Sequence, residues 1–247
     1  MRALLMAAGL GKRLRPITNS IPKCLVAINN RPLLDNWLEL LSDAGISDIL
    51  INLHYFPEMV RAHISNSLYP VNITTVLEET LLCTGGTLLR NRAFFQSEPV
   101  MLIHADNLSL FDVRTFMQKF HSRDKDIDMT MMTFNADKPE TCGVVELNAH
   151  GVVCAFHEKV KTPPSSLANA AVYILSPTVI DFIASLGKDV VDFSTEVLPH
   201  FMGRINTFHN DVYHRDIGTV ESLMLAENEY PAAIDKFRRS RLVMRSI

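Results

Sequence analysis

Cysteine is scarce in this 247-residue sequence, which contains only four, and no two of them are near neighbours. Without a Cys-x-x-Cys pair the usual zinc-binding pattern is excluded, and the wide spacing gives no sign of a disulfide framework. Free thiols fit a reducing compartment, so we expect the protein to be cytoplasmic.

Long apolar runs are also lacking. No uninterrupted run approaches the roughly 20 residues that a membrane-spanning helix requires. The apolar stretch 1–7 is too short for a secretory signal peptide, and cations follow it almost at once. We therefore expect no membrane association and no cleaved leader.

Positive charge is not in excess, because the net charge is −3 and the isoelectric point is near 6.3. A nucleic-acid partner is therefore not expected, since its footprint is a basic surface. Basic residues also cluster in the C-terminal tail, residues 231–247, which we expect to be solvated. The sequence also shows no internal repeat and no low-complexity segment.

What is present is the composition of an ordinary globular protein, with 47% hydrophobic residues in a length that suits one large domain. Apolar runs at 1–7, 48–52, 72–77 and 100–104 alternate with helical periodicity at 34–44 and 57–67. This rhythm predicts an α/β fold, a Rossmann-like mixed, mostly parallel sheet with helices on both faces. Past residue 135 the pattern changes to antiparallel strands at 143–147 and 152–157. Further strands are expected at 25–28, 128–134, 167–173 and 205–208, and helices at 113–120, 177–185, 194–202 and 219–229.

Small residues follow the first predicted strand, where Ala7, Ala8, Gly9 and Gly11 would let backbone N–H groups approach an anion closely. Cations come next, and their side chains suit a polyphosphate: Lys12, Arg13, Arg15, and then Lys23 after Pro22. We interpret this segment as a phosphate-binding loop.

Two better-known glycine-rich loops do not fit. A Walker A loop needs glycine where Met6 stands and Ser or Thr where Arg13 stands. A dinucleotide fingerprint needs a third glycine where Leu14 stands. Both readings are excluded.

One carboxylate stands at the carboxyl end of an apolar strand, the edge at which open α/β sheets bind ligands. Asp106 follows the strand at 100–104 and is well placed to hold a metal ion. An aspartate in such a place can instead cap a helix, and Asp112 is the alternative residue for that task.

The run 7–18 together with Pro22-Lys23 closely resembles the signature of the sugar-1-phosphate nucleotidylyltransferases, in a variant similar to the short bacterial members. The resemblance implies that this loop embraces the triphosphate and that Arg13 and Lys23 act on phosphate as catalytic residues. The implied nucleotide-binding set is Ala7, Ala8, Gly9, Gly11, Lys12, Thr84, Gly85 and Gly86. The last three residues of that set match the family's base-reading loop.

Other motifs follow in the family's order, as far as Thr219. They are His104-Ala105-Asp106-Asn107, Cys142-Gly143-Val144-Val145, Phe156-His157-Glu158-Lys159, Ala168-Asn169-Ala170 and Asp216-Ile217-Gly218-Thr219. The second resembles Tyr-Gly-Val-Val, with Cys142 in place of the aromatic residue. The resemblance implies that Asp106 and Asp216 hold Mg²⁺. It also implies a sugar-phosphate site of Asn107, Gly143, Glu158, Lys159 and Asn169.

The implied fold is that of the nucleotide-diphospho-sugar transferases. It would place a nucleotidyltransferase domain at 1–230, with a nucleotide-binding half at about 1–135, a sugar-binding half at about 136–230, and the basic tail behind it. The implied substrates are a nucleoside triphosphate and a sugar 1-phosphate, and relatives of this kind often form homo-oligomers.

The implied products are a nucleoside-diphosphate sugar, as used in polysaccharide biosynthesis, and pyrophosphate. The motifs are most similar to mannose- or heptose-1-phosphate guanylyltransferases, which use GTP. Uridylyltransferases of the muramate or glucose-1-phosphate type stay open, as does a non-catalytic nucleotide-sugar-binding protein, because Cys83, His104 and Val160 depart from the pattern. The cytidylyltransferases share the opening loop, but Glu158-Lys159 and the Asp216 motif argue against them.

Overall fold

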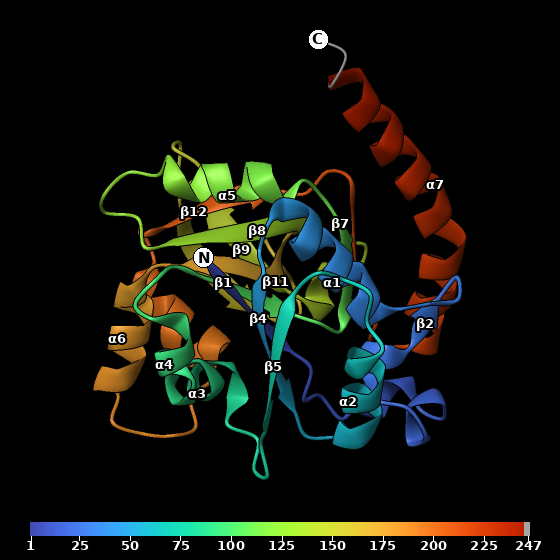
Figure 1. The fold of residues 1–247 in the computed structure, drawn as a ribbon. Coiled ribbons are helices and arrows are strands. Elements are labelled where there is room, and N and C mark those ends of the chain that lie inside the picture. Colours follow the sequence, from blue (N-terminus) through green and yellow to red (C-terminus); the bar gives the residue numbers. More distant parts are fainter. Residues whose placement is uncertain (245–247) are drawn as a thin grey trace.

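A mixed nine-stranded sheet forms the centre of the computed structural model, which describes residues 1–244, with side chains described as far as Arg239 (Figure 1). Four strands lie parallel, in the order β6, β1, β4, β5: β1 (Arg2–Met6), β4 (Asp48–Leu53), β5 (Asn72–Leu77) and β6 (Val100–His104). The predicted α/β sheet is confirmed, and these four strands agree with the sequence ranges to within a residue or two.

The second half of the sheet is mainly antiparallel. β11 (Leu167–Leu175) pairs along one edge with β6 and, at Ala168, with β9 (Gly143–Leu147), which forms a hairpin with β10 (Val153–Glu158). β8 (Met129–Asn135) also pairs with β11, and β12 (Ile205–His209) runs parallel to β8. The change of rhythm expected past residue 135 therefore marks a real change of topology.

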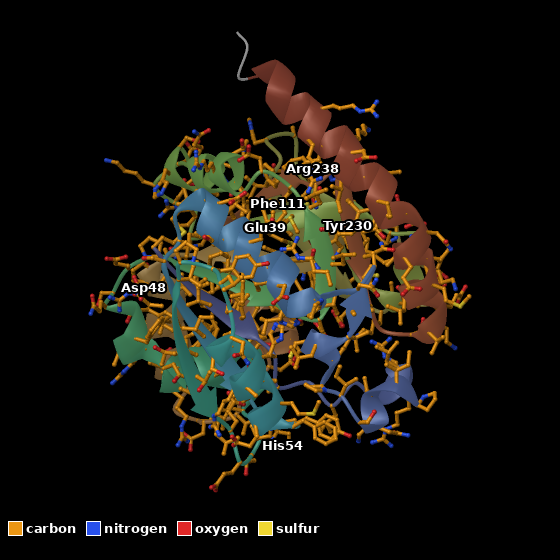
Figure 2. All side chains as sticks on the ribbon, turned by 45° about the vertical axis from the view of Figure 1, so that its right-hand side comes forward. Glu39, Asp48, His54, Phe111, Tyr230 and Arg238 are labelled. Carbon is orange, nitrogen blue, oxygen red and sulfur yellow. The ribbon has the colours of Figure 1, made fainter. Side chains whose placement is uncertain are left out.

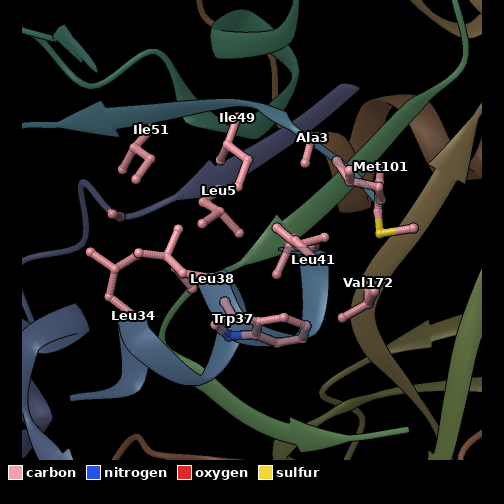
Figure 3. Close-up of a cluster of buried hydrophobic side chains, with 14 of the residues drawn as sticks. Ala3, Leu5, Leu34, Trp37, Leu38, Leu41, Ile49, Ile51, Met101 and Val172 are labelled. Atoms are coloured by element: carbon pink, nitrogen blue, oxygen red, sulfur yellow. The ribbon is translucent and has the colours of Figure 1, made fainter. Parts of the chain in front are cut away.

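Helices cover both faces of the sheet because β1 is apolar on both. Ala3 and Leu5 pack into the core that lies beneath α1 (Leu33–Ala44), α2 (Pro57–Ser65) and α5 (Val113–His121) (Figure 3). Leu4 packs into the core on the other face, beneath α3 (Cys83–Arg90), α4 (Arg92–Phe95) and α6 (Pro177–Ser185). Burial on both faces is the reason that such a strand reads as a continuous apolar run.

A small antiparallel ribbon, which the sequence did not predict, lies apart from the main sheet. It consists of β7 (Asn107–Leu110) and β13 (Tyr213–Asp216), with Asp216 opposite Asn107. A third apolar cluster joins this ribbon to the N-terminal loop and to α7 (Val220–Met244). The ribbon thus connects positions that are about one hundred residues apart in the chain.

The last helix corrects the sequence interpretation, which ended it near residue 229. α7 continues through Pro231 to Met244, so residues 231–244 of the expected tail are helical, and 245–247 lie outside the described residues. Proline has no N–H and leaves the carbonyl four residues earlier without its helical partner. Here that carbonyl, of Glu227, accepts a hydrogen bond from Asn29 Nδ2 at 3.2 Å. Figure 2 shows α7 beside α1, with Tyr230 and Glu39 labelled on the two helices.

Two other expectations also need correction. The helix expected at 194–202 is a π-helical turn, Phe193–Val197, followed by a 3₁₀ turn, Leu198–Phe201, because Pro199 lacks the N–H that a regular α-helix would use. The strand expected at 25–28 is reduced to β2 (Ala27–Ile28), which pairs with β3 (Arg31–Pro32).

Candidate active site

The parallel strands end at one edge of the sheet, and the predicted site segments begin there. The predicted phosphate loop follows β1, the glutamates before the predicted base loop follow β5, and Asp106 follows β6. This is the edge at which open α/β sheets bind ligands. The fold therefore brings together the segments that the sequence indicated separately.

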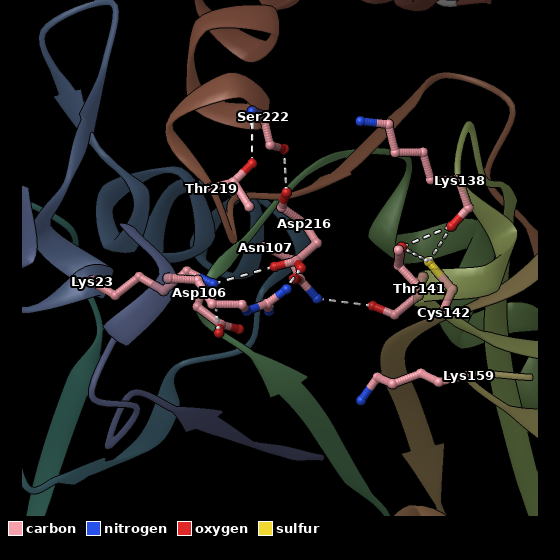
Figure 4. Close-up of polar contacts among 12 residues, drawn as sticks. Lys23, Asp106, Asn107, Lys138, Thr141, Cys142, Lys159, Asp216, Thr219 and Ser222 are labelled. Carbon is pink, nitrogen blue, oxygen red and sulfur yellow. Dashed lines mark hydrogen bonds and ion pairs between the residues drawn. The ribbon is translucent and has the colours of Figure 1, made fainter. Parts of the chain in front are cut away.

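Two carboxylates converge on one ammonium group at this edge (Figure 4). Lys23 Nζ donates to Asp106 Oδ2 at 2.8 Å and to Asp216 Oδ1 at 3.2 Å. The Lys23 side chain is 7% exposed, whereas Asp106 and Asp216 are 34% and 48% exposed. The carboxylates thus face the solvent side of a buried cation, where a ligand can reach them.

The ribbon explains how Asp216 reaches Asp106. In the pairing of β13 with β7, Asp216 stands opposite Asn107, the neighbour of Asp106. Asn107 fixes β7 through its carbonyl, which accepts from Trp37 Nε1 at 2.9 Å, and through its amide, which donates to Ala170 O at 3.1 Å. Asn107 was expected to contact the sugar phosphate. Its amide instead holds β7 against β11, and a sugar contact stays a prediction.

The charges at this centre reinforce one another. Burial alone disfavours the charged form of Lys23, but Asp106 and Asp216 outweigh that effect and raise the pKa of the ammonium. Burial likewise opposes ionisation of Asp106, and the nearby Lys23 more than compensates, so the pKa of Asp106 lies below its ordinary value. Lys23 and Asp106 are therefore both charged at neutral pH.

Arg13 approaches the same centre from the phosphate loop. Its NH2 group lies 3.5 Å from Asp216 Oδ2, and its side chain is 69% exposed. Gly218 makes this approach possible, because a Cβ there would lie 2.7 Å from Asp216 Oδ2 and 3.0 Å from Arg13 NH2. Arg13 is therefore an exposed cation beside a buried one.

The turn of the phosphate loop is built around Gly11, whose φ of +59° favours glycine. Thr18 Oγ1 donates to the Gly11 carbonyl at 2.8 Å and closes the loop. Ala7, at the loop's start, donates its N–H to Asn52 Oδ1 at 2.8 Å. A Cβ on Gly9 would meet no protein atom within 4 Å, so this backbone faces open space.

The two glycines of the predicted base loop have a packing role that the sequence interpretation missed. Gly85 and Gly86 lie against the segment 187–192, which leads out of α6. A Cβ on Gly86 would lie 2.1 Å from Asp189 O, and one on Gly85 would lie 2.7 Å from Val191 Cγ1. The Gly85 N–H also donates to Val191 O at 2.9 Å. A segment of the predicted sugar-binding half thus supports the base loop.

Thr84, also predicted to bind nucleotide, lies beside an unusual histidine. Its Oγ1 is 3.3 Å from His104 Nε2, at the end of β6. Burial lowers the pKa of His104, so the ring is neutral at physiological pH. The contact links the base loop to the strand that carries Asp106.

Sequence reasoning gave no role to a buried carboxylate that connects the two loops. Glu78 Oε1 accepts from Asn52 Nδ2 at 3.1 Å and from Thr87 Oγ1 at 2.5 Å. Because Asn52 also holds the Ala7 N–H, the chain of hydrogen bonds runs from the phosphate loop to α3. The signal available in the sequence was polar: Asn52 interrupts an apolar strand, and Glu78 directly follows another.

Four of the five predicted sugar residues lie on or next to β9, β10 and β11, whereas Asn107 lies on β7. In β10, Glu158 stands opposite Gly143 of β9, and Lys159 Nζ pairs with Glu158 Oε1 at 2.8 Å. A Cβ on Gly143 would lie 2.9 Å from Glu158 Oε2, so the absence of a side chain at residue 143 leaves room for this carboxylate. On β11, Asn169 donates to Tyr173 Oη at 2.5 Å and accepts the Ala171 N–H at 3.0 Å. The fold brings these residues together, and their contact with a sugar stays a prediction.

Among residues 1–239, no three acidic, histidine or cysteine side chains form a metal cluster. Asp106 and Asp216 are two oxygen donors that reach one cation, and such a pair suits Mg²⁺ when substrate phosphates and water complete the coordination. Asp112 takes the other task considered for an aspartate: its Oδ1 accepts from Thr115 N at 3.0 Å and caps α5. No helix in the described part of the chain combines the length and the apolar character needed to cross a bilayer.

Comparisons with known proteins show which sequences this chain is similar to. The family model described as nucleotidyl transferase matches residues 2–233. Mannose-1-phosphate guanyltransferase 2 of Candida glabrata is 28% identical over 250 residues, which cover 98% of this chain and 68% of that protein. Mannose-1-phosphate guanylyltransferase of Mycobacterium tuberculosis is 30% identical over 227 residues, which cover 90% of this chain and 62% of that protein. The chain thus spans about two thirds of the length of these relatives.

Solved structures share the fold. HddC from Yersinia pseudotuberculosis superimposes with a TM-score of 0.79 at 24% identity, covering 93% of this chain and 99% of that one. An apo UDP-glucose pyrophosphorylase gives a TM-score of 0.76 at 22% identity, covering 94% of this chain and 98% of the other. The fold implied by the sequence resemblance is confirmed.

Proposed function

Because the chain belongs to the nucleotidyl transferase family, we propose that it joins a nucleoside triphosphate to a sugar 1-phosphate and releases pyrophosphate. Mannose or heptose 1-phosphate and GTP are the preferred substrates in this proposal, since two relatives are named mannose-1-phosphate guanylyltransferases. The observation that carries the proposal is the meeting of Arg13, Lys23, Asp106 and Asp216 at the carboxyl edge of the sheet.

The reaction needs little covalent chemistry from the protein. An oxygen of the sugar phosphate attacks the α-phosphorus of the triphosphate, the bond to the β-phosphate oxygen breaks, and pyrophosphate leaves with its electrons. Catalysis of this kind rests on holding the two phosphates in line and on neutralising the charge that develops. The residues at the edge of the sheet are of the types that this task requires.

Each residue at the centre has a separate task in this proposal. Arg13, which is accessible and lies 3.5 Å from Asp216, would bind the triphosphate and stabilise the negative charge that develops on the leaving pyrophosphate. Lys23 is buried and held by two carboxylates, so it would fix their positions and add charge near the α-phosphate. Asp106 and Asp216 would hold Mg²⁺, which, when bound, neutralises phosphate charge.

The test is a pyrophosphate-release assay with Mg²⁺, crossing GTP, UTP, CTP, dTTP and ATP with mannose, heptose, glucose, N-acetylglucosamine and muramate 1-phosphates. Turnover with GTP and mannose or heptose 1-phosphate is expected. Turnover only with UTP would favour the uridylyltransferase alternative. Nucleotide-sugar binding without pyrophosphate release in any well would favour the non-catalytic alternative.

The variant Arg13→Ala tests whether the activity belongs to this site. Removing the guanidinium should lower kcat/KM about 100-fold or more, since charge-stabilising groups of this kind are worth that much. The melting temperature should hardly change, because the side chain is exposed and makes one weak ion pair. Lys119→Ala, which removes an exposed cation on α5, is the matched control and should keep full turnover. Unchanged turnover in Arg13→Ala would contradict the assignment.

A further inference from the structure

A cavity of about 360 Å³ lies beside the carboxylate centre, and none of the five predicted sugar-phosphate residues lines it. One wall consists of the end of β13 and the start of α7, including Asp216, Ser222 and Leu225. The opposite wall consists of the end of β8 and the following loop, including Phe134, Lys138 and Cys142. We call this cavity the rim pocket. Figure 4 shows its two walls, with Asp216, Thr219 and Ser222 facing Lys138, Thr141 and Cys142.

The rim pocket is continuous with both halves of the proposed site. Asp216 and Arg13 of the phosphate centre line its inner end. On the other side, Cys142 directly precedes Gly143, and its carbonyl accepts the Lys159 N–H at 3.1 Å. A sugar phosphate held between Asp216 and Lys159 would therefore have the rim pocket as its neighbour.

The charges of the rim pocket cancel in pairs. Its cations are Arg13, Lys138 and Arg215, and its anions are Asp137, Asp216 and Glu221. Arg13 pairs with Asp216 at 3.5 Å, Lys138 with Glu221 at 3.1 Å, and Arg215 with Asp137 at 2.9 Å. The lining thus offers no excess charge to attract an ionised group.

The remaining surface is apolar or neutral. Phe134, Ala136 and Leu225 contribute apolar area, and the Cys142 side chain adds a small, polarisable group. The His214 ring packs against the Phe134 ring, with 4.3 Å between the ring centroids. Ligand pockets of this volume usually combine such apolar surface with a few polar groups that fix orientation.

We propose that the rim pocket receives an uncharged substituent, larger than a hydroxymethyl group, that the acceptor sugar carries. An acylamino group and an extended carbon chain share the required chemistry. The proposal rests on the proposed function, because it defines the class of sugar 1-phosphate that this site prefers; of the two sugars named there, it favours the heptose over mannose, which is a plain hexose. An acidic substituent is disfavoured, since it would have to displace a carboxylate from the Lys138–Glu221 or the Arg215–Asp137 ion pair.

The experiment compares kcat/KM, by pyrophosphate release with the best nucleoside triphosphate, for four acceptors. They are a plain hexose 1-phosphate, the same sugar with an acylamino group, one with an extended carbon chain, and one with a carboxylate-bearing substituent. For at least one uncharged, larger acceptor, kcat/KM should be about tenfold or more above that of the plain hexose, which is the usual effect of filling a pocket. The acceptor with the highest kcat/KM shows whether the pocket prefers an acylamino group or an extended carbon chain.

Two variants on adjacent positions of α7 connect this preference to the rim pocket. Leu225→Trp should fill the pocket. It should lower the ratio of kcat/KM for the preferred larger acceptor to kcat/KM for the plain hexose at least about fivefold. Met224→Trp adds the same ring outside the lining and should leave the ratio unchanged, since Met224 is 58% exposed and does not line the rim pocket. Melting temperatures of both variants would show that each is folded.

The results separate the two proposals. The assignment of the rim pocket is overturned if the plain hexose 1-phosphate is used as well as every larger acceptor. It is also overturned if Leu225→Trp leaves the ratio of kcat/KM values unchanged. In both cases the proposed function stands. A preferred acidic acceptor overturns the assignment of the rim pocket as well. A folded protein that turns over no sugar 1-phosphate contradicts the proposed function itself and this inference with it.

Discussion

Glu78 illustrates how much a single buried side chain can determine at the residue scale. Its carboxylate accepts three hydrogen bonds, from Asn52, Thr87 and the Leu82 N–H, and all three donors belong to segments around the proposed nucleotide site. It makes no ion pair among the described residues. We infer that Glu78 is a positioning residue, which fixes the two loops relative to each other without touching the reacting atoms.

Replacing this carboxylate should reveal that role. Glu78→Gln places an amide donor where one oxygen accepted, so at least one buried donor is left unsatisfied, which costs about 1–3 kcal/mol. The free energy of unfolding in urea should fall by that amount, and KM for the nucleoside triphosphate should rise more than kcat falls.

The matched control is Glu79→Gln, because Glu79 is the exposed neighbour of the buried Glu78. The free energy of unfolding of this variant should stay within about 0.5 kcal/mol of that of the original protein. Equal behaviour of the two variants would contradict a positioning role for Glu78.

At the element scale, α3 depends on two glycines that meet the segment 187–192. Gly86→Ala would press a methyl group against the Asp189 carbonyl, with 2.1 Å between Cβ and oxygen. We expect a loss of about 1–3 kcal/mol in unfolding free energy, the usual cost of overpacking, measured by urea denaturation.

Gly9→Ala should behave in the opposite way. Because no protein atom lies within 4 Å of the added Cβ, stability should change by less than about 0.5 kcal/mol. Affinity for the nucleoside triphosphate, measured by calorimetry, should fall at least about tenfold, the value of one hydrogen bond to a charged group. Unchanged affinity would show that the backbone at Gly9 does not approach phosphate.

The segment 187–192 also gives a pH-dependent prediction. Lys188 pairs with Glu196, and the Asp192 N–H donates to Glu196 Oε2 at 2.9 Å. These two contacts lower the pKa of Glu196 below its ordinary value of 4.5. The unfolded chain therefore takes up this proton first as the pH falls, and the stabilisation is complete above about pH 4.5 and is lost below it.

The comparison that isolates this effect is Glu196→Gln. The original protein should have the higher melting temperature at pH 7, and the difference should shrink as the pH falls through the folded-state pKa of Glu196. A difference that stays constant from pH 7 to pH 3 would exclude the ion pair as its source.

Elements defined by short-range patterns could be predicted from the sequence. Apolar runs identified β1, β5 and β6, and helical spacing followed by Gly45 identified α1, because those signals are local. The ribbon of β7 and β13 could not be predicted, since its pairing joins segments with no pattern in common. The support of Gly86 by Asp189 was hidden for the same reason.

The candidate site shows the same division. Arg13, Lys23, Asp106 and Asp216 were indicated by their motifs and do meet in the fold. That Lys23 would be the buried partner of both carboxylates did not follow from the sequence, which contains no information on which side chains face one another. The division of the chain into two halves and a tail remains a prediction.

At the scale of the whole molecule, α7 holds the N-terminal loop and the ribbon together. Tyr230 is 5% exposed in the third apolar cluster, which includes Leu14 from the phosphate loop and Leu110 from β7. Its hydroxyl donates to Asn36 Oδ1 at 3.3 Å on α1. Its ring also packs against Tyr213 of the ribbon, with 5.4 Å between the ring centroids, so this side chain joins α7 to α1 and to the ribbon.

Tyr230→Ala should therefore destabilise the protein by about 3–5 kcal/mol, as truncation of a buried aromatic ring usually does. Denaturation in urea, followed by circular dichroism, measures the change. Met224→Ala, on an exposed position of the same helix, should lower stability by less than about 0.5 kcal/mol. A small loss in Tyr230→Ala would mean that α7 contributes little to the fold.

The pairing of β7 with β13 also has a consequence for biosynthesis. A ribosome makes the chain from its amino end, at about 5–20 residues per second. The phosphate loop, the base loop and Asp106 therefore leave the ribosome well before Asp216, which pairs with Asn107 across the ribbon. Until then Lys23 has one carboxylate instead of two, so the nascent protein acquires its complete charged centre only when the last strand is in place.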